Sequence, residues 1–383
     1  MRVLICGGGV IGASIAYFLG RKGVAATVIE STGIACAASG KSGGFLALDW
    51  CDGSPLAPLA RRSFALHARL AQEVADDWGY RRLDTYGGYA GFGREQRPSD
   101  FGLGWLDEGV TIGQALGSRE TTAQVHPAAF TAAMMRAAAA LGAELRQGRV
   151  TGVVRQADPA RVAGVEVGGE IVEGDAVVIA LGPWSILAAQ WLPLPAVYGL
   201  KGHSLVFDTG GRVPGQAAFL EYREPGGAVL TPELFPRRDG TTYVCAISSE
   251  QTLPVDPARV APDPGAIERL EAMCRALSPV LADADIVARQ ACYRPVTRDG
   301  MPLIGAVPGI AGAYIATGHS VWGILNAPAT GEAMAELIVG GDAGAVDLSP
   351  FDPARLRPID RGWLDRNRPM LVTSLNRRDV LQR

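Results

Sequence analysis

The hydrophobic and polar positions at the start of the chain predict a strand, a helix and a second strand. Val3–Cys6 is a short, wholly apolar run, which is typical of a parallel strand buried on both faces. A glycine-rich turn and a helical pattern follow to about Arg21, and Ala26–Glu30 is the second predicted strand. Together these elements predict an α/β fold with a parallel sheet.

Two later stretches each predict an apolar strand that ends in a glycine-containing turn. The first is Val177–Ala180, followed by Gly182. The second is Ala313–Ala316, followed by a loop at 318–323 and a helix to about Val339, with Pro328 expected in its first turn. Because open α/β sheets bind ligands where such strands end, both turns are candidate parts of a binding site.

The middle of the chain has a different pattern. The segments LVFDTG, AVLTPELF and TTYVCAIS are strand-like, and Asp239-Gly240 is a turn signal between the last two. An alanine-rich stretch at 127–141 predicts a helix that suits the α/β part.

Composition excludes some classes of protein. The 383 residues allow two domains or one large α/β unit, and the net charge of −3 gives no general reason to expect nucleic acid as a partner. Six scattered cysteines without a C-x-x-C pair argue against a zinc site and a disulfide framework, so no metal is expected. They fit a reducing, cytoplasmic location.

The apolar N-terminus carries a glycine cluster unlike a signal peptide, and no later run of roughly 18 apolar residues predicts a membrane span.

Lysine is scarce in this chain. Of the 36 lysines and arginines only three are lysines, at Lys22, Lys41 and Lys201. Lysine is a compact cation whose pKa responds to its surroundings, and arginine cannot replace it in that role. The three lysines are therefore candidates for a specific function.

The turn after the first strand carries the pattern G-x-G-x-x-G, formed by Gly7, Gly9 and Gly12. The first glycine permits a tight turn, the second lets a pyrophosphate approach the backbone, and the third lets helix and strand pack closely. The N-terminus of the helix offers free N–H groups to the phosphates. Glu30 would accept hydrogen bonds from the adenosine ribose and would repel a 2′-phosphate, which disfavours NADP.

Three further segments favour FAD over NAD. The stretch STGIACAASGKSGGFLAL after Glu30 is rich in small polar residues that could follow the pyrophosphate and the ribityl chain. The strand at 177–180 ends at the level of the sheet where ligands bind. The helix after residue 323 begins where its dipole would stabilise an anionic reduced flavin, and an NAD enzyme has no need of this.

The chain resembles the FAD-dependent oxidoreductases of the D-amino-acid oxidase superfamily, in the glycine oxidase and sarcosine oxidase branch. The resemblance runs from Met1 to about Pro353 and depends on the motifs GGGVIG with Glu30, AQVHPAAFTAAMMRAAAALGAEL, VVIALGPWS, YRPVTRDGMPLIG and ATGHSVWGILNAPATG. The last two are the most specific and are similar to glycine oxidase. The resemblance implies oxidation of a carbon–nitrogen bond by hydride transfer to the flavin, followed by hydrolysis of the imine.

The resemblance also implies a discontinuous Rossmann-like FAD-binding domain and an antiparallel-sheet substrate domain. The FAD-binding domain would take residues 1–50, 118–196 and 286–345. The substrate domain would take residues 85–117 and 197–285. Residues 51–84 would be a helical connection, and residues 346–383 a C-terminal extension.

The candidate catalytic residues combine this resemblance with their chemistry. Arg294 falls on the carboxylate-binding arginine of glycine oxidase, and its planar fork suits a bidentate pair; the alternative is a structural arginine paired with Asp299. Glu233 lies roughly where glycine oxidase has a tyrosine. An acid there would favour a substrate with an extra cation, and the alternative is an exposed strand residue. His319 and Trp322 would shape the cavity roof or contact the isoalloxazine ring.

The candidate cofactor-binding residues lie in the same motifs. They are Gly7, Gly9, Val10, Ile11, Gly12, Glu30, Ser31, Ser39, Gly40, Lys41, Ser42, Val150, Gly182, Trp184, Arg294, Gly318, His319, Trp322, Gly323, Ile324 and Leu325. His126 and His203 are expected to be structural instead, because they lie near motif edges where backbone groups need hydrogen bonds.

Two points of the chemistry stay open. Lys41 and Lys201 are candidates for a cation near the flavin that favours oxygen reduction. The strand TTYVCAIS lacks the lysine that sarcosine oxidase has there, so an oxidase and a dehydrogenase with another acceptor are both open. Cys292 aligns with the cysteine that links flavin covalently in sarcosine oxidase, but its neighbours resemble glycine oxidase, whose flavin is not covalent. Non-covalent FAD is therefore favoured, with Cys292 as a small buried hydrophobe.

Residues 357–383 carry seven arginines and three aspartates, a local net charge of +4 that suits a solvated extension or a docking segment.

The principal hypothesis is an FAD-dependent oxidase or dehydrogenase of an amino acid or N-methyl amino acid, with this small molecule as partner. The alternative is a flavin-binding assembly or trafficking factor, since some relatives with a similar GHSVWG loop have such roles. The oligomeric state stays open.

Overall fold

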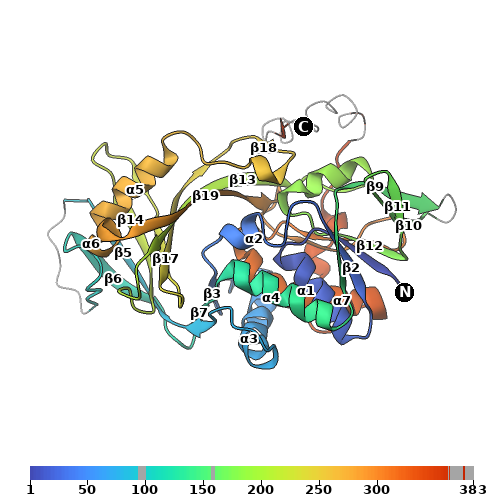
Figure 1. Cartoon of the computed structure of the whole chain (residues 1–383), viewed down its shortest axis with the longest axis horizontal. Coiled ribbons are helices and arrows are strands. Elements are labelled where there is room, and N and C mark those ends of the chain that lie inside the picture. Colours follow the sequence, from blue (N-terminus) through green and yellow to red (C-terminus); the bar gives the residue numbers. More distant parts are fainter. Residues whose placement is uncertain (94–100, 157–159, 361, 363–373, 376–383) are drawn as a thin grey trace.

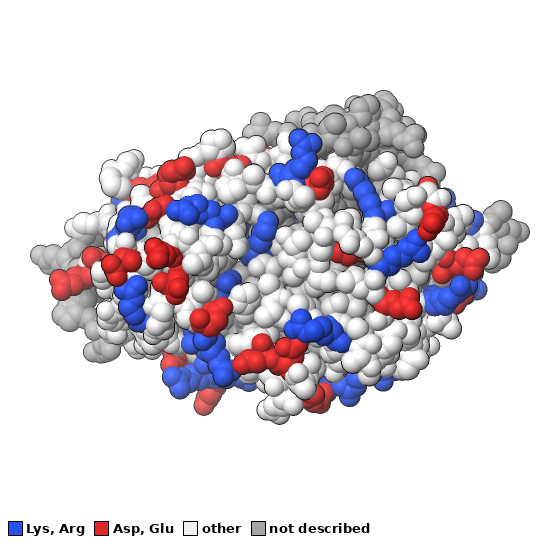
Figure 2. Space-filling view, viewed as in Figure 1, with Lys and Arg blue, Asp and Glu red and all other residues white. Residues whose placement is uncertain are grey.

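The computed structural model describes residues 1–93, 101–156, 160–360, 362 and 374–375. Within this part of the chain an α/β unit lies beside a large, mainly antiparallel sheet (Figure 1). Among the described residues no helix is both long and apolar enough to cross a bilayer, and no cluster of three or more histidine, cysteine or acidic side chains is arranged to hold a metal ion. Figure 2 shows cationic and acidic side chains intermingled over one face of the molecule.

The α/β unit is built on a six-stranded sheet in the order β20-β21-β12-β1-β2-β8. The strands are β1 (Val3–Cys6), β2 (Ala26–Glu30), β8 (Glu144–Gln147), β12 (Ala176–Ile179), β20 (Leu303–Ala306) and β21 (Ala313–Thr317), and only β20 runs antiparallel to its neighbour. The predicted strands at 3–6 and 26–30 are confirmed. Those predicted at 177–180 and 313–316 are also present, and their observed ends differ by one residue.

β1 is apolar throughout because both faces of the sheet are covered. Val3 and Ile5 belong to the core formed with three helices, whereas Leu4 and Cys6 belong to the core on the other face. The helices are α1 (Val10–Arg21), α4 (Pro127–Ala140) and α7 (Gly323–Gly340), as predicted within one or two residues at each end. The other face is covered by the meander β9 (Val150–Gln156), β10 (Arg161–Val167) and β11 (Glu170–Glu173), and by the 3₁₀ segment η1 (Gly182–Gln190).

The predicted position of Pro328 in the first turn of a helix is wrong. Pro328 lies inside α7, one turn further along, where it has no N–H to give to the carbonyl of Ile324. His67 compensates for this loss, because its Nε2 lies 3.0 Å from Ile324 O and 3.2 Å from Leu325 O. Burial lowers the pKa of His67 to about 4, so the ring is neutral and donates through Nε2.

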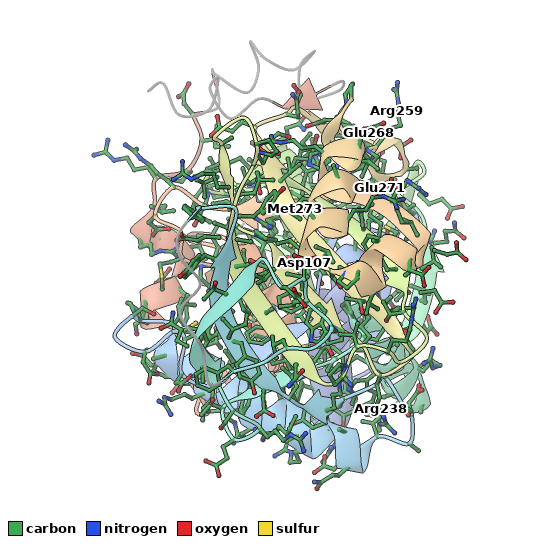
Figure 3. All side chains as sticks on the ribbon, turned by 90° about the vertical axis from the view of Figure 1, so that its left-hand side faces the viewer. Asp107, Arg238, Arg259, Glu268, Glu271 and Met273 are labelled. Carbon is green, nitrogen blue, oxygen red and sulfur yellow. The ribbon has the colours of Figure 1, made fainter. Side chains whose placement is uncertain are left out.

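The large sheet has the strand order β19-β13-β17-β16-β14-β5-β6, with β15 beside β14. These strands are β5 (Asp84–Ala90), β6 (Val110–Gly117), β13 (Tyr198–Asp208), β14 (Gln216–Arg223), β15 (Val229–Leu230), β16 (Glu233–Pro236), β17 (Thr241–Ser249) and β19 (Asp285–Val296). The predicted turn at Asp239-Gly240 joins β16 to β17. Helices α5 (Ala266–Leu277) and α6 (Pro279–Asp283) pack on the outer face, and Figure 3 shows α5 across it, with Met273 buried against the sheet.

Short elements connect the two parts. A small sheet of β3 (Phe45–Ala47), β7 (Thr122–Gln124) and β4 (Arg81–Arg82) lies between them, and the helix α3 (Ala57–Glu73) packs on α7. A short helix, α2 (Ala38–Lys41), interrupts the small-residue segment that follows β2. The 3₁₀ segments η2 (Pro257–Arg259), η3 (Ser320–Trp322), η4 (Ser349–Phe351) and η5 (Pro353–Arg355) complete these connections.

The predicted domain boundaries at 286 and 345 do not coincide with the packing. β19 pairs along its length with β13, so residues 286–296 belong to the large sheet and not to the α/β sheet. Residues 346–360 pack on the α/β unit, where Phe351 is fully buried and Ile359 donates its N–H to Leu194 O at 3.0 Å. Of the basic tail, residues 357–360, 362 and 374–375 are described, and β22 (Ser374–Leu375) pairs with β18 (Leu253–Pro254). The rest of the tail lies outside the described residues.

Candidate functional site

A cavity of about 500 Å³ lies between the α/β sheet and the inner face of the large sheet. On one side it is lined by the residues that follow β1, β2, β12 and β21, at the carboxyl ends of these parallel strands. On the other side it is lined by side chains of β13, β14, β16, β17 and β19. A ligand in this cavity would therefore contact both parts of the molecule at once.

The turn between β1 and α1 is shaped by its glycines. Gly7 has φ +116°, and a Cβ there would collide with Ala180 O. A Cβ on Gly12 would collide with Gly7 O, so helix and strand can approach only because this residue has no side chain. At Gly9 a Cβ would meet only Ser39 Oγ, at 3.1 Å, and Gly9 lines the cavity. The space in front of the helix N-terminus is thus left open, as a pyrophosphate requires.

Glu30 and Ser39 hold the backbone around this turn. One carboxylate oxygen of Glu30 accepts a hydrogen bond from Gly8 N at 2.7 Å, and the other accepts from Thr32 N at 2.8 Å. Ser39 Oγ accepts from Val10 N at 2.9 Å, which ties the short helix α2 to the start of α1. The carboxylate therefore lies at the edge of the cavity, in the position expected for contact with a ribose.

The loop before α7 forms another wall. Its residue His319 is 4% exposed, with Nε2 3.1 Å from Thr330 Oγ1, and burial lowers its pKa to about 3, so the ring is neutral. The next residue, Ser320, has φ +50°, a left-handed conformation that costs energy for a residue other than glycine. Trp322 is the residue immediately before α7. Its ring packs edge-on against that of Trp50, with ring centres 6.5 Å apart.

Two buried polar atoms of the cavity lining have no hydrogen-bond partner within the described chain. They are Ser42 Oγ, in the segment after β2, and His319 Nδ1, in the loop before α7. Buried polar groups are nearly always paired, so both atoms are suited to meet groups of a bound molecule. With the open helix N-terminus and the acid after β2, these residues fit FAD extended from the Gly7 turn to the loop at 318–323.

The inner face of the large sheet presents two rows of side chains to the cavity. The strand register places Phe219, Glu233 and Cys245 abreast on β14, β16 and β17. Along each strand, alternate residues share a face, so the paired residues Phe235 and Tyr243 form a second row beside the first, on β16 and β17. The face therefore combines an acid, a thiol and several aromatic rings.

Arg294 reaches into the cavity from the edge strand β19. Its guanidinium lies over Gly202 on β13, where a Cβ would be 3.5 Å from Nη2, and Nη1 donates to Ser248 Oγ at 3.3 Å. Within the described chain it forms no ion pair with a carboxylate. Burial lowers the pKa of Arg294, but nearby Cys245 and Glu233 outweigh this and raise it, so the side chain stays a cation.

The suggested pairing of Arg294 with Asp299 is wrong. Asp299 pairs with Arg355 instead, with Nε 2.7 Å from Oδ2, and it also accepts hydrogen bonds from Thr297 Oγ1 and Met301 N. Asp299 is thus a structural residue that fixes the turn after β19 and the chain at Arg355. Arg294 is left without a partner of opposite charge among the described residues.

Glu233 is not an exposed strand residue. It lines the cavity, and its only hydrogen bond in the described chain is a weak one from the thiol of Cys245, with Sγ 3.5 Å from Oε2. Burial raises the pKa of Glu233, and the charge of Arg294 and the thiol hydrogen bond only partly offset this rise. The site thus holds an acid that would gain from a further hydrogen-bond donor.

Aromatic rings make up much of the remaining wall. The rings of Phe45 and Phe235 are stacked, with centres 5.3 Å apart and an angle of 9° between their planes. Phe235 and Tyr243 are stacked in the same way, with centres 6.1 Å apart and an angle of 6°. Trp50 and Phe219 add a tilted pair at 4.8 Å. Such walls exclude water and offer π-faces to methyl groups or to a cation.

A loop at 250–263 closes the cavity from a further side, because Val255, Asp256 and Pro257 belong to its lining. The end of the loop is fixed by Asp263, which pairs with Lys201 Nζ at 2.5 Å and accepts from Ser249 Oγ at 2.5 Å. His203 supports the same residue, since its Nε2 accepts from Asp263 N at 3.0 Å. Lys201 and His203 are therefore structural residues of the loop.

The structure brings most of the predicted site residues to the cavity. Those that line it are Gly7, Gly9, Val10, Ile11, Glu30, Ser31, Ser39, Ser42, Val150, Gly182, Trp184, Glu233, Arg294, His319, Trp322, Gly323 and Ile324. Of the two histidines expected to be structural, His126 also caps α4, with Nδ1 accepting from Ala129 N at 3.3 Å.

Five predicted residues lie outside the lining: Gly12, Gly40, Lys41, Gly318 and Leu325. The three glycines serve close backbone packing, since a Cβ on any of them would press on a neighbouring residue. Leu325 points into the helical core with 1% exposure. Lys41 donates from Nζ to Ala291 O on strand β19 at 3.4 Å, and it does not line the cavity.

Several lining residues were not predicted. They include Phe45, Trp50, Arg149, Phe219, Phe235, Tyr243 and Cys245. The period-2 alternation of strands held a signal for some of them, because Phe235 lies two residues after Glu233 and Tyr243 two residues before Cys245. Arg149, next to the predicted Val150, had no comparable signal.

A cavity at the carboxyl ends of parallel strands, with a G-x-G-x-x-G turn at one end, is typical of α/β proteins that bind a dinucleotide. The comparison with known families makes this specific, because the family described as FAD dependent oxidoreductase matches residues 2–337. The chain belongs to this family, and FAD is its cofactor.

Individual relatives agree with this assignment. A putative oxidoreductase of Schizosaccharomyces pombe is 30% identical, with 92% of this chain and 97% of the relative covered. Glycine oxidase of Pseudomonas aeruginosa is 29% identical, with 92% and 98% covered. The crystal structure of glycine oxidase from Geobacillus kaustophilus superposes with a TM-score of 0.78 at 25% identity, over 92% of this chain and 99% of that one.

Proposed function

We propose that the protein oxidises the carbon–nitrogen bond of an amino acid or N-methyl amino acid. FAD, when bound, supplies the two-electron oxidation by accepting a hydride from the substrate carbon, and water then hydrolyses the imine. The similarity to glycine oxidases supports this type of substrate. The residues of the chain supply binding, orientation and a cavity with little water.

The observation that carries the proposal is the placement of Arg294. Arg294 is a cation that lines the cavity and has no carboxylate partner among the residues that the structure describes, so it is suited to bind an anionic ligand. A guanidinium pairs best with a carboxylate, through two parallel hydrogen bonds. The guanidinium lies over Gly202, and Nη1 donates a hydrogen bond to Ser248 Oγ, which helps to hold its orientation. A carboxylate bound here would have its orientation set as well as its position.

The other walls suit the rest of such a substrate. The aromatic rings of Phe219, Phe235 and Tyr243 surround the space beside Arg294 and keep it apolar. His319 is neutral near physiological pH, because burial lowers its pKa to about 3, so it adds no charge to the cavity. It serves as a hydrogen-bond partner and not as a cation.

Anaerobic reduction of the bound flavin tests the proposal. The FAD-loaded protein is mixed with glycine, N-methylglycine and a panel of D- and L-amino acids, and the absorbance of the oxidised flavin is followed. We expect at least one of them to bleach the flavin. Arg294→Ala should retain FAD but lose about 3 kcal/mol of transition-state binding, or roughly a hundredfold in kcat/KM, from two charge-assisted hydrogen bonds.

Arg289→Ala is the matched control, because Arg289 lies on the same strand but on the outer face, paired with Glu271 at 3.7 Å. Its kinetics should stay close to those of the unmodified protein. Equal turnover in Arg294→Ala would remove the carboxylate role. Failure of the whole panel to bleach bound FAD would leave the alternative of a flavin-binding assembly or trafficking factor.

A further inference from the structure

Glu233 occupies an unusual position for an acid. It points from β16 into a cavity whose nearby walls are the rings of Phe219, Phe235 and Tyr243. In the described part of the chain it has no ion pair, and its single hydrogen bond comes from the weak thiol donor of Cys245. A carboxylate in apolar surroundings is costly unless a cation or strong donors meet it.

The groups that face Glu233 leave this requirement unmet. Cys245 and Tyr243 face it from β17, and both remain neutral because burial raises their pKa values well above the usual range. Arg294, on β19, is a cation whose charge acts on Glu233, but the two side chains form no ion pair. Cys292, on the same strand as Arg294, is also kept neutral by burial, which raises its pKa.

Arg294 and Glu233 thus present opposite charges to one cavity without touching. An amino acid enters as a zwitterion, with a carboxylate and an ammonium group separated by one carbon. A zwitterion between the two side chains would satisfy both, since the carboxylate would pair with Arg294 and the ammonium with Glu233. This arrangement rests on the proposed function and adds a role at the amine.

We infer that Glu233 binds the ammonium group of the substrate and takes one proton from it. The N–H bond breaks, its electron pair stays on nitrogen, and the proton forms an O–H bond on the Glu233 carboxylate. The products are a neutral amine and a neutral carboxylic acid. Only the neutral amine has the lone pair that assists departure of the hydride from the neighbouring carbon, so the transfer prepares the substrate for oxidation.

The surroundings of Glu233 favour this transfer. Burial raises its pKa, so the carboxylate is a better proton acceptor than an exposed glutamate. Both members of the ion pair become neutral when the proton moves, and a neutral pair is preferred in an apolar cavity. The substrate can then be oxidised at pH values below the pKa of the free amine, where almost all of it is zwitterionic.

The pH dependence of flavin reduction tests the inference, with N-methylglycine or the fastest amino acid of the panel as substrate. In the unmodified protein we expect kcat/KM to level off above the pKa of Glu233. In Glu233→Gln only the free amine can react, so kcat/KM should fall about tenfold for each pH unit below an amine pKa of about 10.

The two profiles should converge as the pH approaches the pKa of the amine. Glu233→Asp keeps the carboxylate and should restore part of the rate at neutral pH. A uniform drop of Glu233→Gln at every pH, with the profile of the unmodified protein, would assign Glu233 a structural role and overturn the inference. That result would leave the proposed oxidation intact, because the unmodified protein would still bleach its flavin.

A binding experiment gives an independent measurement. Trimethylglycine carries a carboxylate and a fixed cation, and tert-butylacetic acid has the same shape without the cation. Calorimetric titration of the FAD-loaded protein should show that trimethylglycine binds about tenfold more tightly, and Glu233→Gln should abolish most of this preference. Because Glu233 must be ionised, the preference should grow as the pH rises through its pKa. An equal preference in both proteins would contradict the inference.

Discussion

Lys201 offers a prediction about stability that the structure makes quantitative. Its side chain is 8% exposed, and its Nζ lies 2.5 Å from Asp263 Oδ1, which is 18% exposed. Asp263 also accepts from Ser249 and supports the end of the loop that closes the cavity. Lys201→Met keeps most of the buried aliphatic part of the side chain but removes the charge. Asp263 is then a largely buried anion that has lost one strong hydrogen-bond donor.

The expected cost follows from the burial of this pair. Removing one partner of a fully buried ion pair costs about 3–5 kcal/mol, because the remaining charge is uncompensated. Asp263 keeps the hydrogen bond of Ser249 and some contact with water, so we expect about 2 kcal/mol in the free energy of unfolding. Replacement of both partners, in Lys201→Met with Asp263→Asn, should recover part of this loss because no buried charge remains.

Urea unfolding of the FAD-loaded protein, followed by tryptophan fluorescence, measures these differences. Lys22→Met is the matched control, because Lys22 is more exposed and lies 3.9 Å from Glu336, so it should change stability by about 0.5 kcal/mol or less. If Lys201→Met behaves like Lys22→Met, the ion pair does not hold the loop and the reasoning is refuted.

The difference between the unmodified protein and Lys201→Met should depend on pH. Burial raises the pKa of Asp263, but the hydrogen bonds from Lys201 and Ser249 outweigh it, so the net shift is downward. A lowered pKa contributes stability above the pKa of the unfolded state, and this contribution is lost as the pH falls through the folded-state pKa. The two proteins should therefore approach each other in stability only in acid.

Two further predictions concern the cofactor. Gly12→Ala should lose FAD, because a Cβ there collides with Gly7 O and pushes α1 off the turn, whereas Gly340→Ala meets nothing within 4 Å and should retain it. Equal FAD content in the two purified variants would contradict this. Acid precipitation should leave the flavin in the supernatant, because burial raises the pKa of the Cys292 thiol and keeps it a poor nucleophile. Flavin in the pellet would show a covalent bond.

The elements that were predicted well are those with local causes. The run Val3–Cys6, the glycines after it and the acid at Glu30 each follow from backbone geometry within one strand–turn–helix–strand unit. Arg294 was proposed from its motif YRPVTRDGMPLIG, which resembles glycine oxidase, and from the planar fork of its guanidinium. Pro328 was misplaced because its missing hydrogen bond is compensated by His67, which is far away in the sequence.

The sequence by itself determined the dinucleotide turn and the alternation that puts Glu233 and Phe235 on one face of a strand. It did not determine which face of the large sheet meets the cavity and which meets α5, because both faces are apolar and period 2 is the same for either choice. Only the tertiary structure decided that Asp299 forms an ion pair with Arg355 and that Asp263 forms one with Lys201. Among the described residues, Arg294 and Glu233 line one cavity and neither forms an ion pair. Their common cavity is a tertiary feature, because it forms only when strands distant in sequence pair in one sheet.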